Sequence, residues 1–221
     1  SAFDTHICNI PFKGEIINGI SCWWFKKTSH IIPNHLLLDN FEPRMNSNTM
    51  TVRKCKVFPI EVIVRAYMTG STSTSIWMNY KNGVRNYCGH QLPDGMVKNQ
   101  VLPNLLITPT TKGVTDELID EKYIVENVMT QEQWNLISQK ALELFRYGQE
   151  LVSKNGLILV DTKYEFGLSP DGEILLVDEL HTPDSSRYFY ADSYKDRLDN
   201  NQAQKQLSKE FVREWLMDNG F

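Results

Sequence analysis

The sequence predicts an α+β fold built from antiparallel strands and packed helices, and three features support this prediction. First, an apolar run at 157–160 and a strand-like segment at 173–177, apolar from Ile174 onward, flank the turn-forming residues Ser169–Gly172, as in a β-hairpin. Second, residues 60–64 form a β-branched run that is typical of a strand. Third, a capping box at 130–133 opens a long apolar stripe at helical spacing. The chain therefore mixes hairpin strands with at least one long amphipathic helix.

The N-terminal part of the chain predicts one helix and two strands. Residues 14–27 place isoleucine, tryptophan and phenylalanine at near-helical spacing, which indicates an amphipathic helix packed on the core. Residues 51–57 alternate in polarity and residues 60–64 are β-branched, so both are expected to be strands. Pro59 lies between them and marks a break, and Arg65 is expected to close the second strand.

A glycine turn at 69–71 follows this second strand. An arginine beside a Gly-Ser turn can hold a phosphate through its guanidinium fork, backbone N–H groups and a hydroxyl, although such turns are also common in surface loops. Residues 89–113 contain three prolines and are expected to be rich in loops. Within them, Thr108–Lys112 offers hydroxyls and an ammonium, which suit an anionic ligand or an ordinary polar loop.

Two helices are expected in the C-terminal half. Thr130 and Gln133 form the capping box of the first, and Gly156 supplies a left-handed stop after it. Ser208 is expected to cap the last helix. The apolar side chains that this last helix is expected to turn inward are Phe211, Val212, Trp215 and Leu216.

The hairpin between these helices carries the chemistry. Asp161, Lys163 and Glu165 follow an apolar run at spacing two, which places all three on one face of a strand. A two-residue turn would set Glu165 opposite Asp178, whereas a three-residue turn with a bulge would make Glu165 share a face with Glu179. Either register brings two carboxylates together, a repulsive arrangement unless a cation neutralises them.

Two cations could supply this neutralisation, namely Lys163 and a divalent ion. Carboxylate oxygens suit Mg²⁺, which usually takes one or two carboxylates plus substrate phosphates. A solvated hairpin with charged ends is the structural alternative. The charges directly continue apolar strands and would border a cleft, and this favours a functional site.

Composition excludes several other classes of function. The chain has 221 residues with 23 basic against 27 acidic side chains, a net charge of −4 that argues against a general nucleic-acid-binding protein. Its four cysteines are scattered without a CxxC pair, so a structural zinc site is not expected. Scattered thiols are typical of a protein in the reducing cytosol, which is the expected location. No apolar run approaches the length of a membrane helix.

Several motifs in order carry a family resemblance over nearly the whole chain. They are Ser1–Asp4 (SAFD), Pro59–Ser71, Leu102–Lys112, Asp161–Gly167 and Asp178–Arg187. Together they resemble the phosphoribosylaminoimidazole-succinocarboxamide synthase (SAICAR synthetase) family. A single phosphate-binding loop would be far weaker support than several long motifs in the same order.

The resemblance implies a two-lobed α+β fold of the SAICAR-synthetase, ATP-grasp-like type. Residues 1–60 would complete a small N-terminal lobe with part of the nucleotide hinge, and residues 61–221 would form the larger lobe with the ribonucleotide, aspartate and metal sites. The implied activity is an ATP-dependent ligase of de novo purine biosynthesis that joins L-aspartate to carboxyaminoimidazole ribonucleotide. ATP and Mg²⁺ would be its cofactors. Its partners would be small molecules rather than nucleic acid or membrane, and its location cytoplasmic.

By the same resemblance, Lys163 and Asp161 are catalytic residues, and Glu165 and Asp178 bind Mg²⁺. The residues that would line the nucleotide site are Lys54, Lys56 and Glu61. Those that would grip the 5′-phosphate of the ribonucleotide are Arg65, Ser71 and Arg187. Those expected near the aspartate and imidazole groups are Lys112 and Asp184.

Family members also have an N-terminal hairpin with a glycine-rich loop and a lysine over the ATP phosphates. The chain begins at Ser1 inside a family motif, so such a segment is expected to precede it in the functional protein. Two other functions stay open on the sequence alone. One is a nucleotide-binding module without activity, and the other is a different Mg²⁺-dependent phosphotransferase.

Overall fold

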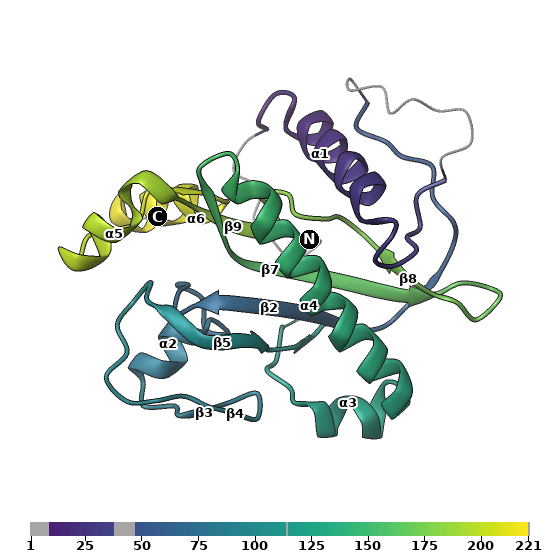
Figure 1. The fold of residues 1–221 in the computed structure, drawn as a ribbon, viewed down its shortest axis with the longest axis horizontal. Helices are drawn as coiled ribbons and strands as arrows, with labels where there is room; N and C mark the ends of the chain where they lie inside the picture. Colours follow the sequence, from purple (N-terminus) through teal and green to yellow (C-terminus); the bar gives the residue numbers. More distant parts are fainter. Residues whose placement is uncertain (1–8, 38–46, 114, 221) are drawn as a thin grey trace.

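The computed structural model describes residues 9–37, 47–113 and 115–220 of the chain. The first motif of the family resemblance, Ser1–Asp4, therefore lies outside the described residues. One antiparallel sheet organises the described part, and its longest strand, β7 (Leu157–Leu168), lies near the middle. The path across the sheet runs β10-β9-β7-β2-β5, with β1 and β8 pairing to β7 and β6 pairing to β2. Strands and helices together make the α+β arrangement that the sequence predicts (Figure 1).

The remaining strands of this sheet are β1 (Lys56–Val57), β2 (Ile60–Tyr67), β5 (Val101–Ile107), β6 (Thr110–Thr111), β8 (Ile174–Val177), β9 (Ser186–Tyr190) and β10 (Gln206–Leu207). A separate two-stranded ribbon pairs β3 (Asn86–Tyr87) with β4 (His90–Gln91). The helices are α1 (Lys13–Thr28), α2 (Ile76–Lys81), α3 (Glu121–Asn127), α4 (Gln131–Ser153), α5 (Ala191–Asp199) and α6 (Glu210–Asp218). Figure 1 shows α4 crossing the sheet over β7 and β2.

The main core lies between this sheet and the helices α1 and α4. Phe25 of α1, Phe145 of α4 and Tyr164 of β7 have no exposed surface and belong to one apolar cluster. Burial of such side chains stabilises the fold by roughly 1.5–3 kcal/mol each. The capping box predicted at Thr130 is present, and Gly156 adopts the left-handed conformation expected after the helix, at φ 71°. The predicted N-terminal helix is confirmed as α1.

A one-residue irregularity in β7 sets which side chains face the core. Leu159 pairs with Tyr188 of β9, but Asp161 pairs with Arg187, so the register shifts between them. Leu159 belongs to the apolar core cluster before the shift, and Tyr164 belongs to it after the shift. A strand alternates its faces at every residue, so this bulge reverses the face that odd-numbered residues take. Asp161, Lys163 and Glu165 consequently point away from the core.

Three strand predictions are wrong in their extent. β2 continues through Arg65 to Tyr67 instead of ending at Arg65, because Tyr67 still pairs with Val101 of β5. Within residues 51–57 only Lys56–Val57 is a strand, and Val52 forms one isolated bridge. The residues between them are mostly exposed and pair with no strand of the sheet. The segment 89–113, expected as loop, contains β5 as an edge strand, where proline is tolerated.

The prediction for the last helix is also wrong in its orientation. Phe211, Val212 and Trp215, expected to turn inward, are 65%, 48% and 55% exposed. The buried residue is instead Glu210, the first residue of α6, at 3% exposure. Polar contacts of this carboxylate, rather than an apolar stripe, hold the beginning of the helix against the sheet.

His181 links the core to the loop that follows β8. Its ring is 1% exposed, lies 2.7 Å by Nε2 from the Tyr164 hydroxyl and packs edge-on against Trp24. Tyr188 donates a hydrogen bond to the His181 carbonyl at 2.5 Å. Gly148 of α4 makes room for this ring, because a Cβ there would lie 2.5 Å from His181 Cε1. The missing side chain thus allows α4 to pack on the segment that leads into residues 182–187.

We expect Gly148→Ala to lower the free energy of unfolding by about 1–3 kcal/mol, because the added methyl overpacks the His181 ring and outweighs the gain in helix propensity. Gly19→Ala is the matched control, since a Cβ at Gly19 in α1 meets no atom within 4 Å. That variant should gain roughly 0.5–1 kcal/mol. Chemical denaturation of both variants measures the difference, and a stabilised Gly148→Ala would contradict the packing described.

Burial lowers the pKa of His181 from 6.5 to about 3, so the folded state binds this proton only at a lower pH than the unfolded state does. Stability from this group is present above pH 6.5 and is lost as pH falls toward the folded pKa. We expect His181→Gln to reduce the loss of unfolding free energy between pH 7 and pH 4.5, by up to about 2 kcal/mol. Denaturation curves at the two pH values test this, and equal losses in both proteins would disprove it.

Candidate active site

The polar face of β7 borders a cavity of about 410 Å³. Its walls come from β2, β6, β7, β9, the start of α6 and the loops between them, and they include Asp161, Lys163, Arg65, Asp184 and Arg187. Register brings these elements together, since Arg65 of β2 and Arg187 of β9 are both paired with Asp161 of β7. The three strands therefore present their charged residues to one space although they are far apart in sequence.

One group of charges, the carboxylate–lysine cluster, consists of Glu61, Lys112, Lys163, Glu165 and Asp178. The Lys163 ammonium lies 2.7 Å from Glu61 Oε1, 3.1 Å from Glu165 Oε1 and 3.9 Å from Asp178 Oδ2. Lys112 forms a close ion pair with Glu165 as well. Burial alone would lower the pKa of Lys163, but the carboxylates of Glu61 and Glu165 raise it well above its ordinary value. Lys163 is therefore a permanent cation and is unsuited to act as a base.

The hairpin register decides which acid lies beside Glu165. Glu165 pairs with Val177, and Ser169 N–H donates to the Glu173 carbonyl at 2.9 Å, so the turn has the three-residue register and the two-residue alternative is wrong. Asp178 nevertheless reaches the cluster, because its backbone leaves the strand at φ 67°. Glu179 turns elsewhere and accepts a hydrogen bond from Thr182 at 2.5 Å.

Asp178 and Glu165 influence each other's protonation. Burial, together with the neighbouring Glu165 carboxylate, raises the pKa of Asp178 to about 6. For Glu165, burial would raise the pKa, but Lys112 and Lys163 lower it below its ordinary value. Each acid disfavours ionisation of the other at close range, and the two lysines offset this more strongly for Glu165 than for Asp178.

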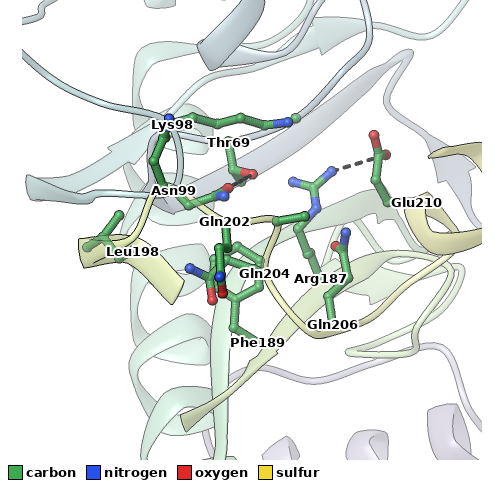
Figure 2. A pocket seen from close by; sticks show the side chains of 13 residues that line it. Thr69, Lys98, Asn99, Arg187, Phe189, Leu198, Gln202, Gln204, Gln206 and Glu210 are labelled. Carbon is green, nitrogen blue, oxygen red and sulfur yellow. Dashed lines mark hydrogen bonds and ion pairs between the residues drawn. The ribbon is translucent and has the colours of Figure 1, made fainter. Parts of the chain in front are cut away.

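A second group, the arginine–acid chain, consists of Arg65, Asp161, Arg187, Glu210 and Arg213. Asp161 accepts from Arg187 at 2.6 Å and lies 3.5 Å from Arg65, so the two arginines that the resemblance assigns to one phosphate meet at this carboxylate. The second arm of Arg187 reaches Glu210 at 3.3 Å, and Arg213 reaches the same carboxylate at 2.9 Å. Figure 2 shows Arg187 pointing toward Glu210 at the edge of a second, smaller cavity of about 190 Å³.

Other predicted site residues take mixed positions. Ser71 donates its hydroxyl to Glu210, at the end of the arginine–acid chain. Asp184 lines the larger cavity and pairs with Lys13 of α1 at 2.9 Å. Lys54 and Lys56 have exposed side chains and do not line that cavity.

Sequence reasoning missed Glu210, Arg213 and Lys13, and it considered Thr108 only as one hydroxyl of a loop that suits an anion. Thr108 accepts a hydrogen bond from Arg65 Nε at 2.8 Å and so fixes the guanidinium plane. Glu210 and Arg213 are charged residues three positions apart within an apolar helical pattern. This spacing was the signal in the sequence that could have predicted a polar contact at the start of the last helix. Lys13 gave no signal, because it lies 171 positions from its partner Asp184.

Comparisons with known proteins agree on one family. A family profile described as SAICAR synthetase matches residues 1–220. The Arabidopsis thaliana protein named phosphoribosylaminoimidazole-succinocarboxamide synthase, chloroplastic, is 51% identical over 221 residues, which are 99% of this chain and 53% of that protein. The Legionella pneumophila (strain Paris) protein named phosphoribosylaminoimidazole-succinocarboxamide synthase is 48% identical over 99% of this chain and 69% of its own length. The chain thus spans about half to two thirds of the length of these relatives.

A solved structure of a family member has the same fold as this chain. SAICAR synthase from Saccharomyces cerevisiae, complexed with SAICAR, superimposes with a TM-score of 0.76 at 32% identity. The alignment covers 99% of this chain and 75% of the yeast chain. Within the described part of the present chain, no helix is long and apolar enough to cross a membrane.

We expect Asp161→Asn to lower the free energy of unfolding by about 3 kcal/mol, because two buried guanidinium groups lose the carboxylate they share. Glu173→Gln is the matched control. It also removes one carboxylate from an ion pair with arginine, but that pair is largely exposed and should contribute less than about 1 kcal/mol. Urea denaturation compares the two, and equal effects would show that the arginine–acid chain contributes no more than a surface pair.

Proposed function

The chain belongs to the SAICAR synthetase family, and on this premise we propose that the protein containing it is an ATP-dependent carbon–nitrogen ligase of purine biosynthesis. Its substrates are ATP, L-aspartate and carboxyaminoimidazole ribonucleotide, and its products are the succinocarboxamide, ADP and phosphate. One observation carries this proposal. On the polar face of one strand, β7, Lys163 lies beside a carboxylate pair suited to a metal, and Asp161 lies beside an arginine pair suited to a phosphate. Lys163 and Asp161 both line the cavity of about 410 Å³.

Glu165 and Asp178 fit a magnesium site by their chemistry. Both offer hard oxygen donors, and the Lys163 ammonium lies 3.1 Å from Glu165 Oε1 and 3.9 Å from Asp178 Oδ2, so the two carboxylates belong to one site. Among the described residues no group of three or more His, Cys, Asp or Glu side chains is arranged to hold a metal ion. Mg²⁺ sites often combine one or two carboxylates with substrate phosphates. When bound there, Mg²⁺ would offset phosphate charge and orient the transferred phosphoryl group.

The reaction proceeds in two steps. The carboxylate of the ribonucleotide attacks the γ-phosphorus of ATP, forming an acyl phosphate and releasing ADP. The aspartate amine then attacks the acyl carbon and phosphate leaves, so an amide bond replaces the carbon–oxygen bond. Lys163 places a fixed ammonium beside the transferred group and stabilises its growing negative charge. Asp161 acts by holding Arg65 and Arg187 at their separation, which is a positioning role.

The remaining residues bind and orient substrates. Arg65, Ser71 and Arg187 hold the 5′-phosphate, since two guanidinium forks and a hydroxyl match its oxygens. Asp184 and Lys112 face the aspartate and imidazole side; the contact of Lys112 with Glu165 also puts it near the metal pair. The residues that we place on the nucleotide side are Lys54, Lys56 and Glu61.

We further propose that residues 1–60 belong to a small nucleotide-binding lobe and residues 61–221 to the larger lobe. The strand β1 at the boundary pairs with β7, which would connect a nucleotide hinge directly to the metal-binding strand. A reducing, cytoplasmic location is supported by the unpaired cysteines Cys22, Cys55 and Cys88 among the described residues.

A coupled assay tests the function. ADP release that requires both aspartate and carboxyaminoimidazole ribonucleotide supports the ligase. ADP release without aspartate, together with a stable phosphorylated product, would indicate a kinase instead. Nucleotide binding without ADP release would indicate a binding module.

We expect Glu165→Gln and Asp178→Asn to lower kcat by about 100-fold or more and to raise the Mg²⁺ concentration needed for half-maximal rate, because each removes a charged metal ligand. Initial rates of ADP release across a Mg²⁺ titration measure both effects. Glu179→Gln is the matched control. It removes a carboxylate next to Asp178 in sequence, but that carboxylate faces Thr182, so its Mg²⁺ dependence should match the unmodified protein.

Unchanged rates and Mg²⁺ dependence in Glu165→Gln and Asp178→Asn would rule out the metal assignment. A loss of stability without a change in Mg²⁺ dependence would instead assign Glu165 to structural pairing with Lys163 and Lys112.

A further inference from the structure

Glu210 is a buried carboxylate at the edge of the proposed substrate cavity. It is 3% exposed although it is the first residue of the exposed helix α6. Ser71 donates its hydroxyl to Oε1, while Arg187 and Arg213 reach Oε2 at 3.3 Å and 2.9 Å. Three donors from separate parts of the chain therefore converge on one anion.

Two of these donors, Ser71 and Arg187, are the groups assigned above to the 5′-phosphate. A hydroxyl and a guanidinium recognise oxyanions in general, and the two oxygens of a carboxylate match one edge of a phosphate. Burial alone would raise the pKa of Glu210, but Ser71, Arg187 and Arg213 lower it below its ordinary value, so the group is ionised at neutral pH. A phosphate and this carboxylate would repel each other at the same donors.

The fold positions Glu210 there and also allows it to leave. β10 pairs with β9, setting Leu207 opposite Tyr188, and this fixes the start of α6 beside Arg187. Beyond Glu210, the apolar side chains Phe211 and Trp215 are 65% and 55% exposed, so a movement of the helix start would uncover little of their surface. The polar contacts of Glu210 can be exchanged for similar contacts with water or a ligand.

We propose that Glu210 is an internal substitute for the substrate phosphate, which occupies the Ser71–Arg187 subsite until a phosphorylated ligand displaces it. This inference rests on the proposed function for the identity of the ligand, but the subsite itself is defined by the contacts of Glu210. The carboxylate keeps Arg187 charge-paired and correctly placed when no substrate is bound. It also lowers the apparent affinity for the phosphate, because only the fraction of molecules with Glu210 displaced can bind.

Ribose 5-phosphate is the probe, and its Kd is measured by isothermal titration calorimetry with the intact protein. If Glu210 occupies the subsite in about nine of ten molecules, Glu210→Gln should bind ribose 5-phosphate about tenfold more tightly. Asp199→Asn is the matched control. It removes an acid paired with Lys195 on the neighbouring helix α5 and should change the Kd less than about twofold.

Glu210→Asp is a second variant that keeps the charge but shortens the side chain by one methylene, which withdraws it from Ser71 and Arg187. It should also bind the probe more tightly, and it serves as the test if Glu210→Gln does not fold. Equal or weaker binding in both variants, or no binding of the probe by any of the proteins, would overturn the proposal.

The coupled assay separates this inference from the proposed function. Turnover by the unmodified protein without tighter probe binding in the variants would remove only the role of Glu210. Tighter probe binding without turnover would leave the anion subsite in place and remove the ligase assignment.

Discussion

The bulge in β7 is the constraint on which the rest of the site depends. Before it, odd-numbered residues such as Leu159 pack into the core; after it, odd-numbered residues face the cavity. Without the shift, Asp161, Lys163 and Glu165 would point at the side chains of α4, where burial of unpaired charge costs several kcal/mol. The neighbouring strands β2 and β9 alternate between the same two faces, since Arg65 and Arg187 lie opposite Asp161 while Val62 and Tyr188 pack in the core. The one extra residue in β7 thus lets the charged residues of β2, β7 and β9 share one face of the sheet while their apolar residues share the other.

Sequence reasoning predicted the parts of the site that follow from local patterns. Spacing two placed Asp161, Lys163 and Glu165 on one face, and the turn residues after Leu168 predicted the hairpin. It could not predict the bulge, because the four consecutive apolar residues 157–160 allow either the odd-numbered or the even-numbered side chains to face the core. It also misplaced α6, since an apolar stripe predicts burial only when a surface is available to cover it, and polar contacts of Glu210 dock this helix instead. Long-range pairs such as Lys112 with Glu165 leave no periodic trace at all.

The two clusters are connected systems rather than separate pairs. Asp161 joins Arg65 to Arg187, Arg187 joins Asp161 to Glu210, and Lys163 joins three carboxylates. Such networks hold their members in fixed positions, and removal of one member leaves others buried without a partner. This explains how long, flexible side chains can be positioned before a substrate arrives. Positioning of this kind reduces the ordering that binding would otherwise require.

Charge balance limits how this site can accept its proposed substrates. Ion pairs of the two clusters join five cations with five carboxylates, so the described groups leave no excess of positive charge. The proposed ligands carry phosphates and carboxylates, and adding them to a charge-balanced, half-buried site would be unfavourable. Two routes restore the balance: a divalent cation enters at Glu165 and Asp178, or a carboxylate leaves, as Glu210 can. Under the proposed function, the metal would compensate the nucleotide end, and departure of Glu210 would compensate the ribonucleotide phosphate. Each substrate anion would then have its own source of positive charge, and the two would not compete for the same cation.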